Sequence, residues 1–247
     1  MKTLVPTIGL LLILASNAWA GGHWRFERTY VDGADTKTAD WSGNGNHGTL
    51  VNAPTLTAGR VGRGMSFAGT EHMTLPKSVS VRGQKQFTLA MWVNAANYTS
   101  VSGLWAEYIA TSSDTVRLSL RFQDLTGLKL AVRGRQQDGD SFTTFVTYPV
   151  SSLPATNVWW HLAVVWDAEA ELVELFVNGR SVSTGAITNT AFTDAETSQN
   201  IFVGNLASLT DPFDGLIDEL IKSDFAWTAE EVRAYYHSGE IPSRRAE

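Results

Sequence analysis

The sequence predicts an all-β protein, a sandwich of two antiparallel sheets with one short helix near its carboxyl end. Three observations support this prediction. Short runs rich in aromatic and β-branched residues recur along the chain, with turn signals between them. One segment, 159–180, has the pattern of a half-buried strand pair. Near the end, a single stretch carries the capping signals of a helix.

The first 20 residues have the features of a signal peptide. Lys2 supplies a positive charge, Ile8–Ala15 forms a short apolar run, and Ala18-Trp19-Ala20 is a small-x-small cleavage site. The apolar run is short for a membrane span, although an uncleaved anchor remains the alternative. We expect cleavage before Gly21 and a secreted or periplasmic protein of bacterial type. The folded domain should then cover 21–242, with 243–247 as a charged, frayed tail.

Composition narrows the classes of partner. The formal net charge of −6 argues against nucleic acid and anionic membrane surfaces. The chain has no cysteine, so disulfides and a bacterial lipid anchor are excluded, and five scattered histidines make no zinc cluster. Calcium, which prefers oxygen ligands, is the metal that this composition suits.

The expected strands follow one another without an internal repeat or a long linker. Alternation in Phe87–Val93 and Val116–Phe122 predicts sheets with one packed face, and it puts Arg117, Ser119 and Arg121 on the face away from the core. The full set of strand-like runs is Trp24–Tyr30, Gly64–Ala68, His72–Leu75, Phe87–Val93, Leu104–Ala110, Val116–Phe122, Leu128–Val132, Phe142–Tyr148, Trp159–Trp166, Leu172–Val177, Asn200–Val203 and Leu216–Ile221.

The segment 159–180 predicts two strands in detail. In the first strand, Trp159, His161, Ala163 and Val165 share one face, and Trp160, Leu162, Val164 and Trp166 share the other. The second strand ends at Asn178-Gly179, which is the strongest short turn signal in the chain.

The expected helix lies near the carboxyl end. Thr228 is the N-cap residue and Glu231 completes a capping box. Val232, Tyr235 and Tyr236 form the apolar stripe. Gly239 can end the helix, and Pro242 prevents it from resuming.

Five segments, in order, resemble the LamG-like jelly roll of the concanavalin A-like lectin/glucanase superfamily. The resemblance covers nearly all of the expected mature chain and implies a jelly-roll sandwich. The chain departs from the family pattern at Ala68, where the family usually has Asp, and at Lys222-Ser223-Asp224. The matching segments are Trp24-Arg25-Phe26 with the loop 39–48 (ADWSGNGNHG), 63–69 (RGMSFAG), 87–93 (FTLAMWV), the pair 159–180, and 213–220 (FDGLIDEL) with the capped helix.

The resemblance also implies a structural Ca²⁺ between the opening loop and the closing strand, with Asp40, Asn44 and Asp218 as ligands. Carboxylate and amide oxygens in a flexible loop suit this ion. The alternative is that Asn, Asp and Gly are present only because they favour turns. The loss of the family's Asp at Ala68 weakens the expectation of calcium.

Catalytic motifs are not evident. A glycosidase needs two carboxylates across the scissile bond, whereas Asp167–Glu171 falls at a solvated hairpin tip. A polysaccharide lyase on the same fold would need a Tyr or His base beside Arg and Asn or Gln. The residues of the right types are Tyr108, Arg121, Arg133, Arg135, Gln136 and His161. His161, however, matches a structural position of the family.

The preferred hypothesis is a secreted, non-catalytic, lectin-like protein that binds a glycan or a cell-surface polymer. Flat aromatics can stack on sugar rings while arginines orient hydroxyls or carboxylates. The alternatives are a polysaccharide lyase or glycoside hydrolase, and a structural or adhesive protein-interaction domain. A further alternative, which is favoured for any single aromatic, is that Trp92, Trp160 and Trp166 fill the core while Trp105 and Tyr108 cap the sandwich. The residues proposed for the binding surface are Tyr98, Trp105, Tyr108, Arg121, Arg133 and Arg135.

Overall fold

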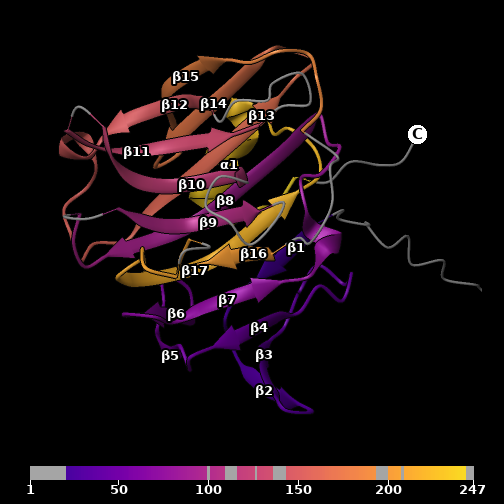
Figure 1. The fold of residues 1–247 in the computed structure, drawn as a ribbon, viewed down its shortest axis with the longest axis vertical. Coiled ribbons are helices and arrows are strands. Elements are labelled where there is room, and N and C mark those ends of the chain that lie inside the picture. The colour runs from indigo at the N-terminus through magenta and orange to yellow at the C-terminus, as the bar shows by residue number, and fades with distance from the viewer. Residues whose placement is uncertain are drawn as a thin grey trace, which may run out of the picture.

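Two antiparallel β-sheets, one in front of the other, form the body of the molecule (Figure 1). The structure is a computed structural model and describes residues 21–98, 101–108, 116–125, 127–135, 143–192, 200–206 and 209–242. The predicted signal peptide and the tail 243–247 lie outside the described residues. The predicted all-β jelly-roll sandwich with one short α-helix is confirmed.

The first sheet has eight strands, in the order β15-β14-β13-β8-β17-β6-β5, with β1 also paired to β17. Its strands are β1 (Gly21–Trp24), β5 (Thr55–Ala58), β6 (Arg63–Phe67), β8 (Gln86–Ala95), β13 (Trp160–Asp167), β14 (Leu172–Val177), β15 (Arg180–Ala186) and β17 (Gly215–Ser223).

The second sheet has nine strands, in the order β12-β11-β10-β9-β16-β7-β4-β3-β2. Its strands are β2 (Thr29–Asp32), β3 (Asp35–Thr38), β4 (Gly48–Val51), β7 (His72–Leu75), β9 (Ser102–Tyr108), β10 (Val116–Leu125), β11 (Gly127–Gly134), β12 (Thr143–Pro149) and β16 (Asn200–Val203). Two 3₁₀ turns, η1 (Lys77–Val79) and η2 (Val150–Ser152), and the helix α1 (Ala229–Ser238) complete the described elements.

The main core lies between the sheets, and a second apolar layer lies under α1. The predicted face of Trp160, Leu162, Val164 and Trp166 joins the main core. The opposite face of β13, including Ala163 and Val165, packs in a cluster with residues of α1. Strand β13 is therefore buried on both faces, because the helix covers the side that an antiparallel sheet usually exposes to solvent.

The helix forms as its capping residues predict. The Thr228 side chain accepts a hydrogen bond from the backbone N–H of Glu231, and the Glu231 side chain accepts one from the N–H of Thr228. Gly239 ends the helix in the left-handed conformation. Among the residues that the structure describes, no helix has the length and apolar character needed to span a bilayer.

Within the described residues, which leave out 109–110 and 142 at the ends of two predicted strands, the predicted strands are found, with one split and four omissions. The expected strand Trp24–Tyr30 divides into β1 and β2, because Phe26 has a φ of 56° and breaks the extended backbone between them. Strands β3, β4, β5 and β15 were not predicted. They are short or rich in Thr, Ser and Asp, so their hydrophobic alternation is weak.

Arg117 corrects one prediction of strand faces. The alternation places it away from the core, yet its side chain is fully buried and its Nη1 donates to Glu107 Oε1 at 2.6 Å. The pairing of β10 with β9 shifts between Val116 and Leu118, and this bulge turns Arg117 toward Glu107.

Strand β17 contains a bulge that ties three segments together. Its pairing with β8 shifts between Asp218 and Ile221, and Glu219 takes a φ of 46°. Glu219 Oε2 lies 2.6 Å from His23 Nε2, and Oε1 accepts a hydrogen bond from Arg25 Nε at 3.1 Å. Burial raises the pKa of Glu219, but His23 and Arg25 outweigh this effect and hold the pKa below its usual range.

We expect Glu219→Gln to lower Tm by about 4–8 °C at neutral pH, because it breaks a buried network worth roughly 2 kcal/mol. A lowered pKa stabilises the fold above the unfolded-state pKa, and this contribution is lost as pH falls through the folded-state value. The Tm difference between the wild type and Glu219→Gln should therefore shrink as the pH is lowered below the pKa of an ordinary carboxyl group. Thermal unfolding followed by circular dichroism across this pH range measures the Tm difference. The control is Glu240→Gln, at an exposed residue. A difference that is independent of pH would contradict the assignment.

Candidate functional site

Two of the three aromatic residues predicted to bind sugar are buried, and the third is partly buried. Trp105 has no exposed area and belongs to the main core, and Tyr108 is 2% exposed and packs with Phe202 and Leu206. Tyr98 is partly buried against Phe122, and its hydroxyl donates to the Pro154 carbonyl. Burial leaves Trp105 and Tyr108 no open face for a pyranose ring, so the stacking role predicted for these two is not supported, and that of Tyr98 stays a prediction.

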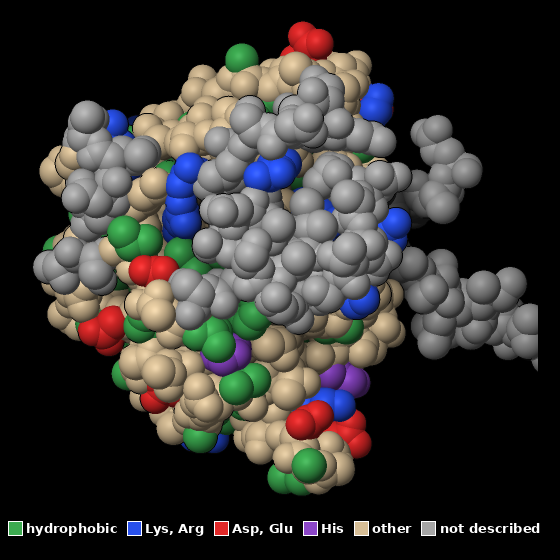
Figure 2. All heavy atoms as spheres, in the orientation of Figure 1, with side chains coloured by type: hydrophobic (Ala, Val, Ile, Leu, Met, Phe, Trp, Pro, Cys, Tyr) green, Lys and Arg blue, Asp and Glu red, His purple; other side chains and the backbone are tan. Residues whose placement is uncertain are grey.

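The predicted arginines fall on the nine-stranded sheet. Arg121 Nε and Arg133 Nη1 both donate to Gln123 Oε1, at 3.0 and 2.9 Å. Burial, followed by the charge of Arg121, lowers the pKa of Arg133 to about 10. Arg135 donates its backbone N–H to the Arg117 carbonyl at the end of the same sheet. Figure 2, which faces this sheet, shows Lys and Arg side chains over its upper strands. The structure thus brings Arg121 and Arg133 together, and their role in binding stays a prediction.

The residues considered for a lyase lie on opposite sides of the sandwich. Tyr108 is on β9 of the nine-stranded sheet, whereas His161 is on β13 of the other sheet, packed against Trp92 and Tyr235. His161 is fully buried, and burial lowers its pKa to about 3, so the ring is neutral. Tyr108 and His161 therefore cannot act together on one substrate as catalytic bases. Gln136 lies outside the described residues.

Asp40 has a complete set of protein partners. Its Oδ1 accepts from the backbone N–H groups of His23 and Ser42, and its Oδ2 accepts from the Ser42 hydroxyl and the N–H of Asn46, at 2.8–3.0 Å. The carboxylate therefore fixes the turns of the loop 40–46. Asn44 donates its Nδ2 to the Gly21 carbonyl at 3.3 Å.

Asp218 is also held by backbone donors. Its Oδ2 accepts from the N–H groups of Arg60 and Val61 at 2.9 Å, and its Oδ1 accepts from Glu219 at 2.7 Å. Burial raises the pKa of Asp218 to about 7 although these bonds oppose the rise. Donor hydrogens point at the oxygens that a cation would need, and no group of three His, Asp or Glu side chains converges in the described ranges. In this arrangement Asp40, Asn44 and Asp218 do not fit a calcium ion. Calcium binding by the protein itself stays a prediction.

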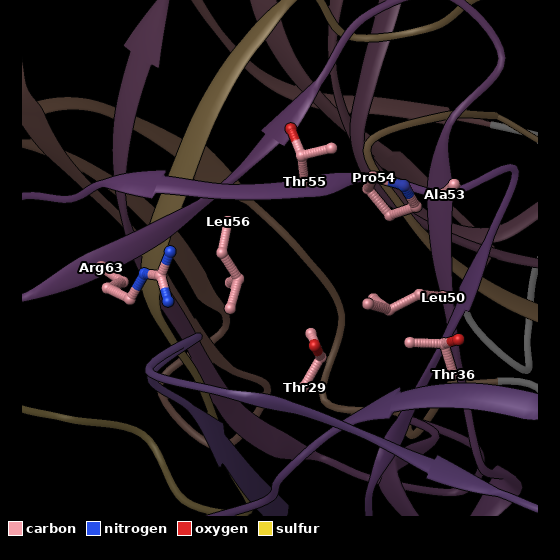
Figure 3. Close-up of a pocket in the computed structure, with 8 residues that line it drawn as sticks. All are labelled: Thr29, Thr36, Leu50, Ala53, Pro54, Thr55, Leu56 and Arg63. Carbon is pink, nitrogen blue, oxygen red and sulfur yellow. The ribbon is translucent and has the colours of Figure 1, made fainter.

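A cleft of about 490 Å³ opens where the two sheets separate (Figure 3). Its volume is within the usual range of ligand sites. Strands β2, β3 and β4 of the nine-stranded sheet form one wall, and β5 and β6 of the eight-stranded sheet form the other. The lining residues are Thr29, Thr36, Leu50, Ala53, Pro54, Thr55, Leu56 and Arg63.

The hairpin of β2 and β3 supplies the polar wall of the cleft. Val31 pairs with Thr36, and Thr36 pairs with Leu50 of β4, so these side chains share the inner face of the sheet. Because the hairpin extends beyond the packed core, this inner face is exposed, and Val31 is a large exposed apolar residue. Gly33, the first residue of the two-residue turn with a φ of 64°, is the signal that could have predicted the hairpin.

The cross-over from β4 to β5 forms another part of the wall. Asn52 and Ala53 both have left-handed backbones, with φ of 60° and 58°. Asn52 Nδ2 donates to the carbonyl and the hydroxyl of Thr70, which holds this turn. For alanine the left-handed conformation is strained, and such strain is concentrated at functional sites.

The chemistry of the cleft is mixed. Leu50, Pro54 and Leu56 supply apolar surface, and three threonines supply hydroxyls that can both donate and accept. Within the described part of the chain, the hydroxyls of Thr29, Thr36 and Thr55 and the guanidinium of Arg63 make no hydrogen bond or ion pair with the protein. They are therefore available to a ligand.

Trp41 is a second surface feature that the sequence did not single out for binding. It is 46% exposed, and the guanidinium carbons of Arg25 and Arg28 lie 5.4 and 5.7 Å from its ring centroid. These cation–π contacts cover part of the ring.

The fold defines a jelly-roll domain, and sequence comparison places it in a family. Residues 67–233 match the concanavalin A-like lectin/glucanases superfamily, so the chain belongs to that family. No curated protein sequence matches the chain.

Solved structures with the same fold include sugar-binding and toxin domains. Domain 4 of AbnA, a GH43 extracellular arabinanase from Geobacillus stearothermophilus solved in complex with arabinotriose, has a TM-score of 0.66 and 21% identity; the match covers 87% of this chain and 97% of that domain. The binding domain of botulinum neurotoxin serotype G has a TM-score of 0.65 and 12% identity, over 87% of this chain and 50% of its own. The binding domain of Paraclostridial Mosquitocidal Protein 1 has a TM-score of 0.61 and 14% identity, and the match covers 91% of this chain and 53% of that domain. This chain spans about half of the two toxin domains.

Asp40→Asn should lower Tm by about 3 °C or more, because at least one of its four donors loses its acceptor. We expect the decrease to be equal in millimolar Ca²⁺ and in chelator, since the carboxylate serves the loop itself. Thermal melts of wild type and variant under both conditions test this. A wild-type Tm that rises with Ca²⁺, together with loss of that rise in the variant, would instead establish a calcium site.

Proposed function

We propose that this protein is a secreted, non-catalytic, lectin-like protein that binds a glycan in the cleft between β2–β4 and β5–β6. The observation that carries the proposal is the lining of the cleft. Sugars present apolar C–H faces and a ring of hydroxyls, and sites that bind them combine apolar surface with a few placed polar groups. Leu50, Pro54 and Leu56 provide the apolar surface, and the threonines provide the polar groups.

The lining also supports binding without catalysis. None of the eight residues is His, Asp, Glu, Tyr, Lys or Cys. General acid–base catalysis, and the activation of a threonine hydroxyl as a nucleophile, both need such a titratable group within hydrogen-bond reach of the reacting atoms. A glycan held here meets hydroxyls and one guanidinium, which can orient it but are poorly suited to moving its protons at neutral pH.

The relatives are consistent with this proposal. A domain of the same fold from an arabinanase has been solved with arabinotriose, and other domains of the fold are toxin binding domains. At 21% identity or less, these similarities establish the fold alone. The choice of a glycan as ligand therefore depends on the cleft.

Thr36→Val should weaken glycan binding about fivefold to tenfold, because it removes one hydroxyl while keeping the shape of the side chain. A glycan array identifies a ligand, and isothermal titration calorimetry then gives Kd for each variant. The matched control is Thr49→Val on the neighbouring strand β4, whose side chain lies on the opposite face and does not line the cleft. Equal affinity of both variants for a glycan that binds the wild type would place the site elsewhere, and absence of any glycan ligand would refute the function.

Secretion is part of the proposal. The small-x-small sequence Ala18-Trp19-Ala20 predicts cleavage before Gly21. Expression in a bacterial host should therefore give an exported protein that begins at Gly21, as read by intact mass. Retention of residues 1–20 in the exported protein would contradict cleavage.

A further inference from the structure

Arg63 is the single charged residue among the eight that line the cleft (Figure 3). In the close-up its guanidinium lies beside Leu56 at one end of the cavity. No carboxylate lines the cleft to neutralise it. The Arg63 guanidinium is therefore the charged group that a ligand meets in the cleft.

The backbone that carries Arg63 is fixed before any ligand binds. The turn 59–62 is closed by a hydrogen bond from Gly59 N–H to the Gly62 carbonyl, and the N–H groups of Arg60 and Val61 donate to Asp218. A side chain at Gly59 would come within 2.4 Å of the Arg63 carbonyl carbon, so the turn closes tightly. A held backbone reduces the entropy that Arg63 loses when it binds.

From this arrangement we infer that the cleft selects acidic glycans, and that Arg63 binds the carboxylate of a hexuronic acid residue. The inference rests on the proposed glycan-binding function and names the ligand class of the same cleft. The planar guanidinium presents parallel N–H donors that match both oxygens of a carboxylate. The threonine hydroxyls meet the sugar hydroxyls, and the leucines and the proline meet the ring C–H groups.

Selectivity must arise locally, because the protein as a whole has a formal charge of −6. Long-range electrostatics disfavour an acidic polymer, and the neighbouring apolar side chains strengthen the attraction only for a carboxylate in direct contact with Arg63. Affinity for the acidic glycan should therefore come from a short-range contact and should fall when that single contact is removed.

The test compares uronic acid oligosaccharides with their methyl esters, which keep the sugar ring and remove the charge. Oligomers of galacturonate, glucuronate and mannuronate, each beside its ester, are titrated by calorimetry into the wild-type protein, Arg63→Gln and Arg233→Gln. Arg233, exposed on α1, controls for the loss of one positive charge away from the cleft. Neutral glycans from the array are titrated in parallel.

We expect at least one acid to bind the wild type at least tenfold more tightly than its ester, with Arg63→Gln removing the difference and Arg233→Gln retaining it. If no acid binds better than its ester, or if Arg63→Gln leaves the preference intact, the selectivity is overturned. In that case, a neutral glycan that binds the wild type and is weakened by Thr36→Val would leave the proposed function standing. Failure of every acid, ester and neutral glycan to bind would overturn both.

Discussion

The bulge at Asp218–Glu219 in β17 is the constraint on which the N-terminal third of the molecule depends. Before the bulge β17 pairs with β6, and after it β17 pairs with β1, while β8 pairs with it on both sides. The backbone cannot change partner without the irregularity, and Glu219 takes a positive φ to provide it. Asp218 then binds the turn between β5 and β6, and Glu219 binds His23 and Arg25. Two adjacent carboxylates thus fix both β1 and one wall of the cleft.

The two ends of the sandwich differ, and the difference explains where a ligand can bind. At one end β12 meets β15, and the Ser183 hydroxyl donates to the Thr147 carbonyl at 2.9 Å, which closes the gap between the sheets. At the other end the edge strands β2 and β5 diverge, and the cross-over at Asn52–Ala53 spans the opening. A cleft between two rigid sheets needs little reorganisation on binding, which favours affinity.

Most of the fold could be predicted from the sequence, whereas the cleft could not. Three features are determined by residues close together in the sequence: the alternation in 159–177, the Asn178-Gly179 turn and the capping box of α1. Such local features can be predicted without knowledge of the tertiary contacts. The strands that line the cleft are only four or five residues long, and β3 is entirely polar, so hydrophobic alternation over them is short or absent. The position of Arg63 opposite the hairpin depends on pairings between segments that are distant in sequence. Likewise, the bulge that buries Arg117 could not be predicted from the alternation of side chains along a strand, because a bulge interrupts that alternation.

Trp105 and Tyr108, two of the predicted stacking residues, are buried for a reason connected with stability. A chain without cysteine has no disulfides and must gain its stability from buried surface, and large rings bury the most area per residue. Within the described ranges, the buried tryptophans are Trp24, Trp92, Trp105, Trp160, Trp166 and Trp227. The abundance of tryptophan therefore reflects the core of this protein. The proposed site depends instead on threonines and an arginine on the strands at and next to the sheet edges. If a glycan binds there as proposed, hydrogen bonds and charge would provide the discrimination, and substituents on the sugar would matter more than the ring face.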